Sequence, residues 1–101
     1  MKIVKLGHEY QLESFDGGLP QTLLFIEKEA IKDSTEMNTI RDGTTNEEIL
    51  KVLIDRLYFL EARMSCRENA IVITKLEESL MWLEKRTEGR VARGVEGKEI
   101  A

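Results

Sequence analysis

The sequence of 101 residues contains one cysteine, one histidine and one proline. With Cys66 as the only cysteine, no intrachain disulfide can form, which excludes a secreted disulfide scaffold. A metal site needs several clustered ligands, and Cys66 with the distant His8 cannot supply them. A lone histidine is usually a surface or satisfied residue, and no other catalytic signature is present. We therefore predict no catalytic residues, no metal and no cofactor, and a protein that is not an enzyme.

Long apolar runs and excess positive charge are also missing. No run approaches the ~20 apolar residues that cross a bilayer, and the first six residues are too short for a signal peptide. The net charge of −4 argues against a general nucleic-acid binder, which is normally basic. We expect a cytosolic protein that binds neither a membrane nor a DNA or RNA duplex. A chain of this size also gains stability from an oligomer interface.

Residues 1–41 have the pattern of β-structure. The runs KIVKL, EYQLESF and QTLLFIEKE are rich in β-branched and aromatic residues, and they are separated by turn material such as Asp16-Gly17-Gly18. We predict two or three antiparallel strands, with EYQLESF and QTLLFIEKE as a hairpin. Residues 37–41 are a candidate for a last strand.

After Asp42 the hydrophobic period changes to that of a helix. Thr45 and Glu48 fit a capping box. A seven-residue repeat follows at Leu50, Leu53, Leu57, Leu60 and Met64. Further apolar residues predict a second apolar face, which packs on the strands or on another subunit; they are Ile49, Ile54, Tyr58 and Phe59.

A second, longer helix follows a tight connection at residues 63–66. Either Ser65, in a box with Glu68, or Cys66 is its cap. Its apolar stripe is Ile73, Leu76, Leu80 and Leu83. So short a connection predicts an antiparallel hairpin. We predict one α+β domain over residues 1–101: a small antiparallel sheet in 1–41, a helical hairpin in 44–94 and a tail in 95–101, assembled as a homo-oligomer through the hairpin.

The second helix ends in a cationic stripe. Trp82, Arg86, Arg90 and Arg93 follow one another at helical spacing. The arginines could simply be solvated charges that pair with glutamates, but a phosphate would relieve their mutual repulsion through bidentate contacts. We assign Trp82 to packing.

Nucleotide binding also needs aromatic rings on which bases stack. Tyr58 and Phe59 on the first helix are candidates, although aromatic residues at helical spacing are by default core. Asn69 could read a base or ribose edge, or it could only support the helix cap.

Four motifs, DGTTNEE, CREN, LEESLMWL and RGVEG, lie within residues 42–98. Together they resemble the helical hairpin of the bacteriophage anti-Thoeris proteins (Tad, type 1) and, more distantly, of the phage anti-CBASS cyclic-dinucleotide sponges. That resemblance implies a sponge, which binds cyclic ADP-ribose isomers in the cytoplasm of the infected bacterium without cleaving them. It also implies a hexamer, with cyclic di- or trinucleotides as possible second ligands between subunits.

Carried over by motif, the resemblance assigns the base-stacking ring to Phe59 and the pyrophosphate clamp to Arg86 and Arg90, in a pocket shared by two protomers. Arg93 and Asn69 are additional ligand-binding candidates. We expect that exchanging Arg90 for alanine abolishes capture and leaves thermal stability nearly unchanged. The alternatives are an adaptor whose hairpin only oligomerises or docks a partner, and a hydrolase of the same messengers.

Overall fold

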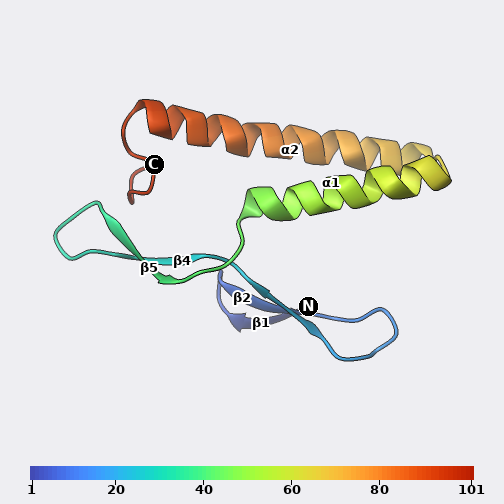
Figure 1. Cartoon of the computed structure of the whole chain (residues 1–101), viewed down its shortest axis with the longest axis horizontal. Coiled ribbons are helices and arrows are strands. Elements are labelled where there is room, and N and C mark those ends of the chain that lie inside the picture. Colours follow the sequence, from blue (N-terminus) through green and yellow to red (C-terminus); the bar gives the residue numbers. More distant parts are fainter. The chain divides into compact units, whose positions relative to one another are not determined.

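The computed structural model describes all 101 residues, five strands followed by two long helices (Figure 1). The predicted α+β fold class is therefore confirmed. The chain forms two compact units. Residues Met1–Thr45 and Gly97–Ala101 make the first, and Asn46–Glu96 makes the second.

The first unit contains a three-stranded antiparallel sheet of β1 (Lys2–Lys5), β2 (Glu9–Leu12) and β3 (Gln21–Leu24). The predicted hairpin is confirmed, because β2 pairs with β3 in antiparallel register. One face of the sheet is apolar: Ile3 stands opposite Tyr10, and Tyr10 opposite Leu23. The Tyr10 ring also meets the edge of the Phe25 ring, with centroids 5.9 Å apart.

A second, two-stranded sheet pairs β4 (Glu27–Ala30) with β5 (Met37–Arg41), so the candidate last strand is confirmed. The prediction of a single strand in QTLLFIEKE is wrong, because the chain changes partner at Phe25 and Ile26. Phe25 N–H donates to the His8 carbonyl at 2.8 Å, and Ile26 N–H donates to the Thr44 carbonyl at 2.9 Å. Gly43 makes this crossing possible, because a Cβ there would lie 2.5 Å from the Phe25 carbonyl carbon.

A charge network surrounds Glu27, which is only 6% exposed. Its carboxylate accepts a hydrogen bond from the Lys5 ammonium. The Arg41 guanidinium lies between two carboxylates, 3.0 Å from Glu9 and 3.9 Å from Glu27. The hydrogen bond from Lys5 lowers the pKa of Glu27 from its ordinary value of 4.5, against the opposing effect of burial. Glu27 therefore stays ionised in the folded protein, which a buried carboxylate does only when it is paired.

The end of the chain is anchored to the connection between β4 and β5. Lys98 Nζ pairs with Glu36 at 3.3 Å, and Glu99 N–H donates to the Thr35 carbonyl at 2.9 Å. Residues 97–101 therefore belong to the strand unit, although they follow α2 in sequence.

The second unit is the predicted antiparallel hairpin of α1 (Asn46–Arg63) and α2 (Arg67–Ala92) (Figure 1). α1 begins directly after Thr45, where a capping box would place it. Of the two predicted caps of α2, Cys66 is the one observed: its Sγ accepts from Asn69 N–H at 3.4 Å. The alternative box with Ser65 is wrong, because the Ser65 hydroxyl donates to Glu61 at 2.6 Å instead.

The hairpin buries few apolar side chains. Ile73, 5% exposed, is the only buried apolar residue of the chain, and α1 has no buried residue at all. Neither helix is long and apolar enough to cross a membrane. The exposed apolar side chains of the hairpin are Val52, Leu53, Tyr58, Phe59, Met64, Ile71, Val72, Met81, Trp82 and Val91.

Candidate functional site

Phe59 lies on α1 near the turn of the hairpin, and it is 56% exposed. The Arg63 guanidinium, one helical turn later, stands 5.8 Å from the centre of the Phe59 ring. A guanidinium at this distance is attracted to the ring face, and it adds a positive charge beside an accessible aromatic surface. The arrangement suits a flat, anionic ligand.

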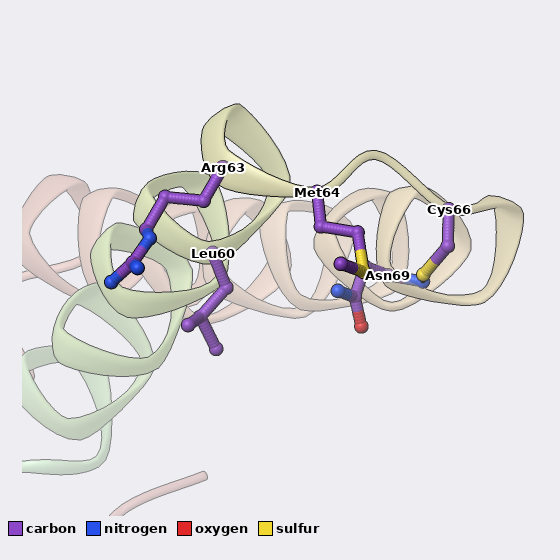
Figure 2. Close-up of a pocket in the computed structure, with 5 residues that line it drawn as sticks. All are labelled: Leu60, Arg63, Met64, Cys66 and Asn69. Atoms are coloured by element: carbon purple, nitrogen blue, oxygen red, sulfur yellow. The ribbon is translucent and has the colours of Figure 1, made fainter.

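A hollow of about 410 Å³ lies at the turn of the hairpin, and it shares Arg63 with the Phe59 contact. Figure 2 shows its lining: Leu60 and Arg63 come from α1, Met64 and Cys66 from the turn, and Asn69 from the first turn of α2. The Asn69 backbone N–H donates to the Cys66 side chain that caps α2. The start of the helix therefore fixes the backbone position of Asn69, whose side chain lines the hollow. Volume and lining are within the usual range for small-ligand pockets.

The predicted arginines lie at the other end of α2, and they differ in their surroundings. Arg86 is exposed and makes no ion pair within the chain. Arg93 is the exposed C-terminal cap of the helix; its N–H donates to the Gly89 carbonyl, and it has a further interaction within the chain. Trp82 is half-exposed rather than packed in the chain, and the Lys85 ammonium lies 5.1 Å from the centre of its ring.

Arg90 is buried, with 4% exposure, and it holds the turn that follows α2. Its Nε donates to Glu96 at 3.2 Å and its Nη2 to the Val95 carbonyl at 2.8 Å, while Val95 N–H returns a bond to the Arg90 carbonyl. Gly94, at φ 71°, supplies the left-handed residue that the turn requires. The burial of Arg90 and its bonds to Glu96 and Val95 argue against the expectation that it can be removed without loss of stability.

The aromatic and the cationic residues lie far apart in one hairpin. Tyr58, next to Phe59, donates from its hydroxyl to Glu77 on α2 at 2.8 Å, which fixes the alignment of the two helices. At 1.5 Å per residue, Arg86 lies about 14 Å farther along α2 than Glu77, and Arg90 about 20 Å farther. Asn69 lies about 12 Å from Glu77 in the opposite direction. One chain therefore separates the predicted residues into two groups.

A second hollow, of about 490 Å³, lies between the helices at the arginine end, and it is acidic. Its lining consists of Glu47, Lys51, Glu84, Thr87, Glu88 and Glu96. Its four carboxylates face the Lys51 ammonium and, at Glu96, the Arg90 guanidinium, so the hollow remains net negative. The surface that suits an anion at this end of α2 is therefore the side that faces away from α1.

Comparison with known families decides the classification. The Acb2/Tad1 hairpin domain matches residues 28–88, which is more than half of the chain. The chain belongs to the Acb2/Tad1 hairpin family. The matched range runs from β4 to Glu88 on α2, so it includes Phe59, Asn69 and Arg86 and leaves β1 to β3, Arg90 and Arg93 outside.

One relative is Thoeris anti-defense 1 of Bacillus phage SBSphiJ7, which is 56% identical over 57 residues. Those residues make up 55% of this chain and 40% of the relative, so the match spans less than half of that protein's length. The family resemblance stated from the four motifs is confirmed.

Two contacts of the site were missed from the sequence. Arg63 stands one turn after Phe59, and the i, i+4 spacing of a cation and a ring could have indicated their contact. Glu96 could not have been assigned to Arg90 from spacing, because the pair depends on the turn after the helix folding back.

Proposed function

We propose that this chain is a phage anti-defence protein that sequesters cyclic nucleotide immune messengers, first among them cyclic ADP-ribose isomers, without cleaving them. It would act in the cytoplasm of the infected bacterium. The name of the phage relative supports anti-defence, and membership of the hairpin family supports transfer of the assignment to this chain. Sequestration acts by mass action, so it needs a low Kd and ample protein rather than catalytic groups.

The observation that carries the proposal is the division of the candidate residues between the two ends of the hairpin. The end at the turn offers the exposed Phe59 ring and, around Arg63 and Asn69, a separate hollow, which suit a base. The other end offers the unpaired guanidinium of Arg86, which suits a phosphate. Phe59 and Arg86 lie on different helices and about 14 Å apart along the hairpin axis, which favours a pocket that takes them from two chains. We therefore place each pocket between two protomers, with Phe59 and Asn69 from one and Arg86 and Arg93 from the other, while the buried Arg90 shapes the turn that follows α2.

The exposed apolar side chains of the hairpin support assembly. Ile73 is its only buried apolar residue, whereas Leu53, Phe59 and Trp82 are among those that stay exposed. Antiparallel pairing of two hairpins would bring the turn of each beside the arginine end of the other, as an isologous interface requires. We propose a homo-oligomer, with a hexamer as the expected state and cyclic di- or trinucleotides as second ligands.

Capture without cleavage can be tested directly. The protein is incubated with cyclic ADP-ribose, freed of unbound ligand by gel filtration and then heat-denatured, and the released nucleotide is analysed by mass spectrometry. Intact messenger is the expected product. Altered messenger would indicate a hydrolase instead. If no messenger were released, the exposed apolar residues would be better explained by an adaptor whose hairpin only oligomerises or docks a partner.

A mixing experiment tests the shared pocket. Phe59→Ala and Arg86→Ala are each expected to abolish capture, because every pocket loses either its ring or its guanidinium. When the two variants are co-expressed, a pocket is intact only if its ring and its guanidinium come from the two unmutated positions. Random assembly then restores about one quarter of wild-type capture. If each pocket belonged to a single chain, the mixture would capture nothing.

A further inference from the structure

Gly89 is in an unfavourable place for a glycine. It lies in the last turns of α2, a regular helix of 26 residues, where glycine is the least favourable residue other than proline. A Cβ built on Gly89 would meet no atom of the chain within 4 Å. No close approach within the chain therefore requires a glycine at this position.

The position of Gly89 on the helix indicates what its missing side chain leaves open. At 100° per residue, Trp82, Arg86, Gly89 and Arg93 fall within about 60° of one another on one side of α2. Glu84, Thr87 and Glu88, which line the acidic hollow against α1, lie at least about 100° away from that stripe. Gly89 is therefore on the outward side of α2, and it interrupts a stripe of large exposed side chains.

We propose that Gly89 is a specificity-determining residue, whose missing side chain lets a phosphate of the cyclic nucleotide approach the backbone of α2 closely enough for the Arg86 guanidinium to bind it. This inference rests on the proposed function. The amides of a helix interior are already used, so the glycine does not add a donor; it removes the atom that would hold the ligand away.

The dimensions agree with this role. Arg86 lies about 4.5 Å from Gly89 along the helix axis, on the same side of α2. Charge-assisted hydrogen bonds from a guanidinium to a phosphate need about 2.7–2.9 Å between nitrogen and oxygen. A methyl group at position 89 would hold a phosphate farther from the backbone of α2 than glycine does. Arg93 already has an interaction within the chain, so Arg86 and Gly89 carry the argument.

The variant Gly89→Ala separates this role from a structural one, because the two effects have opposite signs. Alanine raises helix propensity and meets no atom, so the Tm should rise by about 4 °C. Calorimetric titration with cyclic ADP-ribose should show a Kd at least tenfold higher than that of the wild type. Thr74→Ala is the matched control: it also exchanges an exposed helical residue of α2 for alanine, away from the stripe, and should leave the Kd unchanged.

Three results would overturn the inference. A Kd of Gly89→Ala within twofold of the wild type would mean that no ligand atom needs the space. A smaller mass in solution together with lost binding would mean that the space receives a second copy of the chain. Wild-type protein that binds no cyclic ADP-ribose would refute the proposed function itself, and with it this inference.

Discussion

Arg90 is the residue for which stability and capture are most easily confused. Its guanidinium makes two bonds within the turn that follows α2, at 3.2 Å to Glu96 and 2.8 Å to the Val95 carbonyl. A hydrogen bond to a charged group contributes about 1.5–3 kcal/mol, and the bond to Glu96 belongs at the lower end because that carboxylate is 47% exposed. Arg90→Ala should therefore lower the free energy of unfolding by about 3 kcal/mol.

Arg86→Ala is the matched variant, because Arg86 has the same side chain, exposed and without an ion pair. An exposed helical substitution of this kind should change the free energy of unfolding by at most about 0.5 kcal/mol. Urea unfolding followed by far-ultraviolet circular dichroism, at one fixed protein concentration, measures both. The concentration must be held constant because the stability of an oligomer depends on it.

The outcome decides how binding data on these arginines can be read. If Arg90→Ala is as stable as Arg86→Ala, the buried turn contributes nothing and our reasoning is refuted. If Arg90→Ala is destabilised as expected, its loss of capture does not by itself identify a ligand contact. The contact must then be tested with Arg86→Ala, or with Arg90→Ala under conditions in which it is fully folded.

Three further predictions concern single contacts. Gly43→Ala should lower the free energy of unfolding by about 1–3 kcal/mol in a urea titration, because the new Cβ overlaps backbone atoms; unchanged stability would contradict the crossing geometry. The hydrogen bond to Glu77 raises the pKa of Tyr58 from its ordinary value of 10.0. The stability that this bond gives the folded protein should therefore be present below pH 10 and be lost as pH rises through the raised pKa. A pH titration of Tm should show this loss in the wild type and not in Tyr58→Phe. The pKa of Glu27 is lowered chiefly by Lys5, so the stability that ionised Glu27 contributes should be present above pH 4.5 and be lost as pH falls through the lowered pKa. Glu27→Gln should therefore flatten the acid side of the curve of Tm against pH. An unchanged acid side would assign that loss of stability to other carboxylates.

The helices were predictable from the sequence because their signals are local. A repeat of leucines, a capping pair and a connection too short for any other arrangement lie within the segments that they specify. The same holds for β2 and β3, whose alternating residues flank a turn of Asp16, Gly17 and Gly18.

The parts that were missed depend on contacts distant in sequence. The division of QTLLFIEKE into β3 and β4 arises because Phe25 and Ile26 bond to His8 and Thr44, and no periodicity in the run reports those partners. The burial of Arg90 likewise depends on the chain turning back after α2. In the candidate site, the residue types followed from motif and spacing, whereas their division between the two ends of the hairpin required the alignment set by Tyr58.

That division has a consequence for how a sponge of this kind would work. If each pocket takes its ring from one chain and its guanidinium from another, ligand binds only the assembled protein, and binding stabilises the assembly by RT ln(1 + [L]/Kd) per site. At a ligand concentration one hundred times the Kd, this stabilisation amounts to about 2.7 kcal/mol per site. That is about as much as burying one large apolar side chain contributes, and Ile73 is the only one that the hairpin buries. In that arrangement the ligand itself helps to hold the assembly together. Capture then rises steeply with protein concentration, because both the assembly and the pocket depend on it.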